Sequence, residues 1–102
     1  MNVTDNTERH RYELVEEGAV VAFEDYALDG ERIDLVHTEV AEGHDGRGLA
    51  RQLVEAVLVD VRARGLQVVP SCSYVAGFIA KNPAEYLDLV PEDERARFGL
   101  AG

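Results

Sequence analysis

A glycine-rich segment between a strand-like stretch and a long amphipathic pattern constrains this chain more than any other feature. The segment covers residues 38–50 and contains Gly43, Gly46 and Gly48. Glycine adopts positive φ without steric cost and lets a backbone approach a bulky ligand closely. The residues before the segment are typical of a strand, and the apolar residues after it recur with helical spacing. The sequence therefore predicts a strand that turns through a tight loop into the N-terminus of a helix.

The charges around this helix start indicate an anionic ligand. The N–H groups of a first helical turn have no partners within the helix and attract anions, so acidic residues are normally preferred there. Here His44, Arg47 and Arg51 gather at that end, in a chain whose formal net charge is -10. Basic side chains are unfavourable there for the helix alone, but they suit a phosphate or pyrophosphate. The alternative is an ordinary glycine-rich turn with solvated arginines.

Two common phosphate-binding patterns do not fit this loop. No Gly-Lys-Ser or Gly-Lys-Thr sequence follows the glycines, which excludes a Walker loop. Residues 46–48 are Gly-Arg-Gly, but Arg51 stands where a dinucleotide fingerprint needs its third glycine. A different class of phosphate-bearing ligand has to be considered.

Two segments resemble the GNAT N-acetyltransferases, and in particular their small, single-domain YjdJ-type subgroup. Residues 45–50 are similar to the acetyl-CoA pyrophosphate loop, Gln/Arg-x-x-Gly-x-Gly/Ala: Gly48 and Ala50 match the last two fixed positions, and Asp45 departs from the first. Residues 70–86 contain Pro-Ser-Cys-Ser-Tyr-Val and Asn-Pro-Ala-Glu-Tyr, which look like that subgroup's Pro-x-Cys-x-Tyr-Val and x-x-Pro-x-Tyr segments. The resemblance covers roughly residues 10–90.

The order of elements expected from periodicity agrees with that fold. An Asp29-Gly30 hairpin signal separates two strand-like runs. A strand–helix–strand unit crosses over right-handedly, so the strand after the helix should run parallel to the strand before it. Strands are predicted over 11–16, 19–28, 33–40 and 66–70, and helices from Gly48 to Gly65 and over 74–81. The fold class is therefore α+β, a minimal GNAT-like arrangement of antiparallel strands followed by a parallel β-α-β unit.

Two further expectations concern the N-terminal half of the chain. Residues 1–9 carry few apolar side chains and are predicted to form a flexible tail, ahead of a single domain over 10–102. In the second strand, Ala19, Val21 and Phe23 are expected to share one face.

The resemblance also implies where acetyl-CoA binds. The third and fourth strands would splay apart, the pyrophosphate would lie on backbone N–H groups of the loop, and the pantetheine amides would pair with Val40. Arg47 and Arg51 either add charge at the phosphates or are solvated helix residues. The implied cofactor-binding residues are Val40, Asp45, Gly46, Arg47, Gly48, Leu49, Ala50 and Arg51.

Cys72 is the foremost catalytic candidate, because the subgroup carries a cysteine at the matching position. A thiolate is a strong nucleophile, and a helix N-terminus favours it. One route passes the acetyl group through Cys72 to an amine; in the other, the amine attacks directly and Cys72 only lines the pocket. A free cysteine is also among the most commonly buried residues, so a packing role is the alternative.

Direct transfer needs a base for the amine and an acid for the departing thiolate. Glu39 and His37 share one side of the third strand and are the candidate base or water relay. Tyr74 or Tyr86 is the candidate acid, a role that tyrosine often fills in GNAT enzymes. Surface exposure for Glu39, and packing for the other three, are the alternatives.

Composition bears on the cellular compartment, the partners and metal binding. The single cysteine and the polar N-terminus favour a reducing cytoplasm without export, and no apolar run is long enough to span a membrane. A net charge of -10 argues against nucleic acid as a partner, and three scattered histidines give no metal-ligand spacing.

Together with these patterns, the resemblance implies a cytoplasmic N-acetyltransferase that uses acetyl-CoA, without a metal, to acetylate a small-molecule or protein amine. The acceptor face is open, or a second subunit completes it in a homodimer. The runner-up is a non-catalytic CoA or acyl-CoA sensor or adaptor, and the third possibility is an interaction protein that has lost the ligand.

Overall fold

Residues 2–100 are described by the computed structural model, and they form one mixed sheet with helices. The strands are β1 (Asn2–Asn6), β2 (Arg11–Glu16), β3 (Ala19–Asp29), β4 (Arg32–Val40) and β5 (Gln67–Val69). The helices are α1 (Leu49–Ala63), α2 (Ser73–Lys81), α3 (Pro83–Tyr86) and α4 (Glu92–Arg95), with 3₁₀ turns η1 (Leu87–Leu89) and η2 (Ala96–Phe98).

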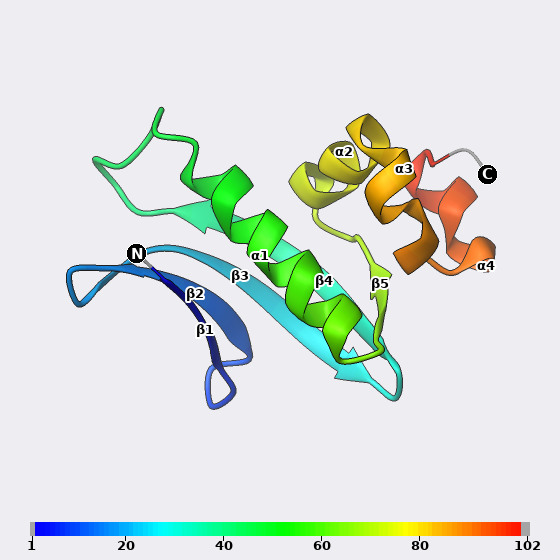
Figure 1. Ribbon diagram of the computed structural model, residues 1–102, viewed down its shortest axis with the longest axis horizontal. Helices are drawn as coiled ribbons and strands as arrows, with labels where there is room; N and C mark the ends of the chain where they lie inside the picture. Colours follow the sequence, from blue (N-terminus) through cyan, green and yellow to red (C-terminus); the bar gives the residue numbers. More distant parts are fainter. Residues whose placement is uncertain (1, 101–102) are drawn as a thin grey trace.

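The sheet has the order β1-β2-β3-β4-β5, and all neighbours are antiparallel except β4 and β5. Figure 1 shows α1 lying across one face of the sheet, while α2, α3 and α4 gather beyond β5, at the edge away from β1. The predicted α+β class, with antiparallel strands followed by a parallel β-α-β unit, is confirmed.

The N-terminal residues differ from the prediction of a flexible tail. Asn2–Asn6 form the edge strand β1, which pairs antiparallel with β2 along its whole length. The hydroxyl of Tyr26 on β3 donates a hydrogen bond to Asp5 at 2.6 Å. Backbone pairing and this bond hold a segment that has few apolar side chains to bury, and the expectation of a tail is wrong for these residues.

The helix α1 follows the apolar spacing of its sequence and packs over β2, β3 and β4. It ends in a Schellman motif: Gly65, at φ 71°, donates to Arg62, and Leu66 donates to Val61. The buried face of α1 consists of Leu49, Leu53, Val54, Val57, Leu58 and Val61.

None of the helices within residues 2–100 is long and apolar enough to cross a membrane.

The buried face of β3 is not the predicted one. Ala22, Glu24 and Tyr26 are buried toward α1, whereas Ala19 is exposed and Phe23 is only partly buried. A register shift between Leu14 and Val15 in the β2–β3 pairing interrupts the alternation. Because side chains alternate along a strand, a one-residue change of phase exchanges the two faces. The expected grouping of Ala19, Val21 and Phe23 is therefore wrong, although Val21 is buried.

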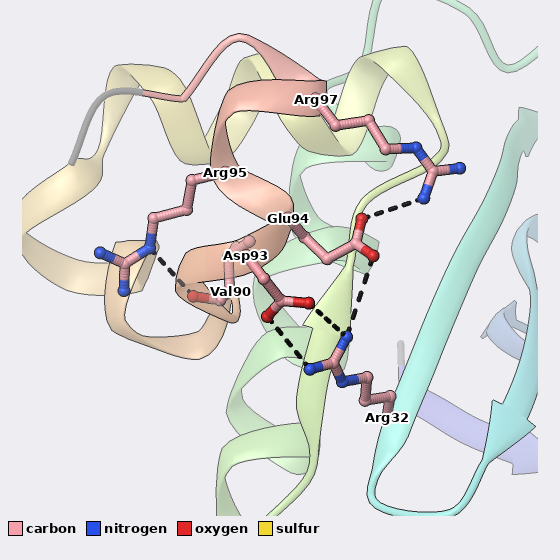
Figure 2. A network of polar contacts seen from close by, with 6 residues as sticks. All are labelled: Arg32, Val90, Asp93, Glu94, Arg95 and Arg97. Carbon is pink, nitrogen blue, oxygen red and sulfur yellow. Dashed lines mark hydrogen bonds and ion pairs between the residues drawn. The ribbon is translucent and has the colours of Figure 1, made fainter.

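The C-terminal helices are attached to the sheet through Arg32 at the start of β4 (Figure 2). Its guanidinium lies 3.1 Å and 3.3 Å from the two oxygens of Asp93 and 3.8 Å from Glu94. Exposed pairs of this kind contribute little one by one. The same region also buries Leu89, Val90 and Leu100 in the core. Figure 2 shows the remaining contacts of the network, from Arg97 to Glu94 and from Arg95 to the carbonyl of Val90.

Candidate functional site

Strands β4 and β5 separate after a short parallel pairing. Their register extends only over residues 32–34 of β4, followed by one bond of 2.8 Å from the N–H of Cys72 to the carbonyl of Leu35. Pro70 has no N–H to continue the ladder, and the N–H of Ser71 turns back to Val69 at 3.0 Å. β4 nevertheless continues to Val40, so its last residues extend beyond the end of β5.

Val40 turns its backbone toward this opening. The N–H of Ala41 donates to the carbonyl of Val21 on β3 at 2.8 Å. Because successive residues of a strand direct their N–H and C=O groups to opposite edges, those of Val40 face away from β3. An extended chain with amide groups could pair there as a further strand.

The loop after β4 leads into an uncapped helix N-terminus. Gly46 and Gly48 have φ of 79° and 72°, a left-handed conformation that other residues adopt only with strain. Gly48 is the N-cap of α1 and has no side-chain cap, and the first turn contains no acidic residue. The first backbone N–H groups of α1 are therefore oriented for an anion.

The basic residues of this loop are already paired. The guanidinium of Arg47 donates two hydrogen bonds to Glu16 on β2, at 2.6 Å and 3.1 Å, and lies 3.0 Å from His44. Arg51 lies 3.5 Å from Glu55, one turn further along α1. Since these contacts are exposed, an incoming phosphate could compete for either arginine.

Between the start of α1 and α2 lies a cavity of about 430 Å³. It carries positive charge from Arg51 on one side and Lys81 on the other, and Tyr74 contributes a half-exposed ring. Its lining consists of Arg51, Ser73, Tyr74, Gly77, Phe78, Lys81 and Asn82. The cavity is thus built from the two helices whose N-termini flank the opening.

Cys72 lies at the N-cap of α2, where β5 has ended, and is 8% exposed. Its sulfur is 3.1 Å from Oγ1 of Thr38 on β4. The hydroxyl of Thr38 in turn donates a short hydrogen bond to Oε1 of Glu24 on β3. Three polar side chains from three different elements therefore form a line that ends at the opening between β4 and β5.

Glu24 is the least expected member of this line. It is 0% exposed, and its Oε2 is a buried atom without a hydrogen-bond partner among residues 2–100. Burial raises the pKa of Glu24 to about 7, and the hydrogen bond from Thr38 opposes that rise. A carboxyl group with this pKa can exchange a proton near neutral pH.

The other predicted residues are not gathered at one point. Glu39 and His37 bond to each other at 3.0 Å and are exposed. They lie on the face of the sheet opposite to the contact between Thr38 and Cys72, because side chains alternate along β4. Tyr74 lines the cavity, whereas Tyr86 is buried with its ring centroid 5.5 Å from that of Phe78.

Sequence reasoning missed Glu24 and Thr38. A signal existed for Glu24, because it lies two residues from both Ala22 and Tyr26 and so shares their face. A carboxylate in phase with apolar positions is unusual in a core. Assigning the wrong face of β3 to the core concealed it.

Comparison with known proteins identifies the family. Residues 11–89 match the model of the GCN5-related N-acetyl-transferase family. The chain belongs to this family.

Relatives carry the name Protein NATD1. The cattle protein is 40% identical over 65 residues, which are 62% of this chain and 58% of the relative, and the human protein is 38% identical over 65 residues with the same coverage. The chain thus matches less than two thirds of the length of these relatives. The solution structure of a GCN5-like protein from Staphylococcus aureus aligns with a TM-score of 0.63 at 23% identity, over 88% of this chain and 87% of that one, and shows the same fold.

Proposed function

We propose that the protein is an acetyl-CoA-dependent N-acetyltransferase that acts on an amine. Membership of the GCN5-related family supports acyl transfer as the class of activity. One observation carries the proposal: the gap between β4 and β5 has Cys72 at its inner end and adjoins the uncapped N-terminus of α1. A thioester and a pyrophosphate on one extended ligand would meet these two features together.

The residues present fit acetyl-CoA along this path. Backbone N–H groups of Gly46 through Ala50 would hold the pyrophosphate, and Val40 would pair with the pantetheine amides. Arg51 and Lys81 would place positive charge beside the phosphates of the nucleotide end, from the cavity between α1 and α2. When bound, acetyl-CoA supplies an activated acetyl group.

Cys72 supports a route through an acetylated enzyme. Its sulfur lies beside Thr38 at the end of the opening, at the N-terminus of α2. The amine would then take the acetyl group from Cys72. The alternative is direct attack by the amine, for which Tyr74 remains the better-placed acid, since it lines the cavity while Tyr86 is buried.

Glu39 and His37 remain predictions for the base of the direct route. Their exposed pair would have to serve an amine that approaches from the other face of the sheet. A second subunit that covers this face would complete the acceptor site, in keeping with the predicted homodimer. A small-molecule amine and a protein amine are both compatible with such an open surface.

A CoA or acyl-CoA sensor is the second candidate function. The separation of Glu39 from the contact between Thr38 and Cys72 favours it, because no predicted base adjoins the thiol. The two functions share the binding site and differ in transfer alone. Turnover of acetyl-CoA with an amine pool therefore decides between them.

The first experiment is thermal unfolding with acetyl-CoA, CoA and ADP. A ligand at a hundred times its dissociation constant adds ~2.7 kcal/mol. For a domain of this size, the melting temperature should rise on the order of ten degrees. No shift with acetyl-CoA would contradict both candidate functions.

Gly48→Val tests the loop, with Gly30→Val as its matched control. Both glycines have left-handed φ, 72° and 62°, so both variants carry similar backbone strain. Gly30 lies in the turn between β3 and β4, whereas Gly48 caps α1. The shift with acetyl-CoA should disappear only in Gly48→Val.

A further inference from the structure

The hydrogen bonds that connect Cys72 through Thr38 to Glu24 have a defined donor and acceptor at each step. A hydroxyl group has one hydrogen, and Thr38 gives it to Oε1 of Glu24. While Glu24 is ionised, the contact of 3.1 Å between Oγ1 of Thr38 and the sulfur of Cys72 is therefore a hydrogen bond from the thiol to the hydroxyl oxygen. Both bonds therefore point from the thiol toward the carboxylate.

The surroundings of Glu24 do not explain its burial as a structural ion pair. None of the salt bridges within residues 2–100 includes Glu24, and its Oε2 has no partner. Burying a carboxylate without a cation is costly, so such a group needs an explanation.

The ionisable neighbours of Glu24 are few. Tyr12 of β2 is its register partner, but the Tyr12 hydroxyl is engaged by Asp60 and Arg64 of α1. His37 of β4 lowers the pKa of Glu24, and Asp25 of β3 raises it. Among residues 2–100, Cys72 is the one ionisable group that Glu24 reaches through hydrogen bonds.

We propose that Glu24 is the proton acceptor for the Cys72 thiol, acting through the hydroxyl of Thr38. The proposal rests on the acetyltransferase function only for the use made of the thiolate. Glu24 does not touch the reacting atoms and is a positioning residue in this scheme.

One proton moves from the thiol to the carboxylate by way of the hydroxyl. The S–H bond of Cys72 breaks, and its proton moves to Oγ1 of Thr38 while the proton of Thr38 moves to Oε1 of Glu24. The products are a Cys72 thiolate and a neutral Glu24 carboxyl group, with no change in total charge. When an acyl donor transfers its acetyl group to the sulfur, the carboxyl group of Glu24 would return the proton through the hydroxyl of Thr38 to the leaving thiolate.

Alkylation of Cys72 tests this relay without any acetyl-CoA. Cys72 is the single cysteine of the sequence, so iodoacetamide labelling followed by intact mass reports on one thiol. Because the ionised form of Glu24 accepts the proton, the wild-type rate should rise through an inflection near pH 7, where Glu24 titrates. A wild-type profile without this inflection overturns the proposal.

Two conservative variants remove different parts of the relay. Glu24→Gln keeps the shape and removes the acceptor, while Thr38→Val keeps the shape and removes the connecting hydroxyl. Each should abolish the inflection and lower the labelling rate at pH 7.5 by about tenfold or more. Thr38→Ser, which retains a hydroxyl, should keep the inflection. An inflection that persists in both Glu24→Gln and Thr38→Val overturns the proposal.

Glu13→Gln is the matched control. Glu13 is also a strand glutamate of low exposure, 8%, but it bonds to Arg11 and Asn6. Its labelling profile should equal that of the wild type. Thermal shifts with acetyl-CoA on the same variants test the relay and the acetyltransferase function separately. Ligand binding with an unchanged labelling profile rejects the relay alone. An altered labelling profile without ligand binding rejects the acetyltransferase function alone.

Discussion

Two polar clusters, each built around a buried side chain, face α1 from neighbouring strands, and their hydrogen bonding differs. Around Tyr12, the hydroxyl donates to Asp60 at 2.5 Å and accepts from Arg64 at 2.8 Å. Around Glu24, the opposite residue in the β2–β3 register, one carboxylate oxygen has no partner within residues 2–100. The first cluster includes a cation and the second does not.

This difference indicates that the Tyr12 cluster stabilises the fold, whereas the Glu24 cluster serves the candidate site. A polar cluster with complete hydrogen bonding and compensated charge stabilises the docking of α1 on the sheet. A carboxylate left partly unsatisfied beside a thiol departs from the usual rule for cores, and such departures concentrate at functional sites. The Tyr12 cluster should therefore respond to mutation through stability, and the Glu24 cluster through reactivity and pH.

The largest expected contrast is in acetyl transfer. Cys72→Ala should lower the rate by at least about a hundredfold if the acetyl group passes through the thiol. Tyr12→Phe should leave the rate within about threefold, because its hydroxyl serves the docking of α1. Steady-state release of CoA in the presence of an amine pool measures both rates. Transfer at the wild-type rate in Cys72→Ala would instead support direct attack by the amine.

The next contrast is the dependence of stability on pH. Glu24 has a folded-state pKa of about 7 against an ordinary value of 4.5, so the folded protein keeps its proton longer than the unfolded chain. The raised pKa therefore contributes about 3 kcal/mol to the free energy of unfolding. This contribution is complete below pH 4.5 and is lost as the pH rises through 7.

Glu24→Gln should remove this dependence. Its free energy of unfolding relative to wild type should increase by about 3 kcal/mol between pH 4.5 and pH 8, because any cost of the buried amide is independent of pH. Urea unfolding at several pH values measures the difference. A constant difference across this range would mean that Glu24 is ionised in the folded protein throughout.

A smaller effect is expected from Tyr12→Phe, and it should not change with pH. Losing the hydroxyl removes the hydrogen bond to Asp60 and the one from Arg64, at a cost of about 1–2 kcal/mol. Burial raises the pKa of Tyr12 far above its ordinary value, so the group is neutral between pH 5 and pH 8. The same urea titrations provide the measurement, and a cost that varied with pH would show that the two clusters are coupled.

The elements that the sequence predicted correctly depend on local signals. The Asp29-Gly30 turn, the apolar spacing of α1 and Gly65 at its end act over a few residues, and the parallel pairing of β4 with β5 follows from the crossover rule. The strand β1 could not be predicted in this way. All of its residues except Val3 are polar, and it is held by pairing with β2 and by the bond from Tyr26 to Asp5.

Of the candidate site, the sequence singled out the loop and the cysteine, and their roles stay predictions. Both lie in short motifs whose residues are adjacent in the chain. The relay partners come from β3 and β4, and Glu24 meets Thr38 through strand pairing across fourteen residues. The register shift at Leu14/Val15 changes which side chains of β3 face the core. The hydrophobic periodicity of β3 alone does not indicate this bulge, because a bulge is a feature of the pairing between two strands.

The smallest expected effect concerns Arg47, whose pairing with Glu16 forms a third kind of polar contact, exposed and complete. If Arg47 serves the phosphates of acetyl-CoA, it must leave Glu16, and the competition weakens binding. Glu16→Gln should then tighten acetyl-CoA binding by about two- to threefold at low salt, an effect that vanishes at high salt.

Arg47→Gln is the companion variant. It should weaken binding by a similar factor and make Glu16→Gln silent in the double variant, because a coupling between two residues disappears when one of them is absent. Calorimetric titration with acetyl-CoA at two salt concentrations measures all four proteins. Equal affinities for wild type and Glu16→Gln at low salt would place Arg47, like Tyr12, among the residues that only hold the fold.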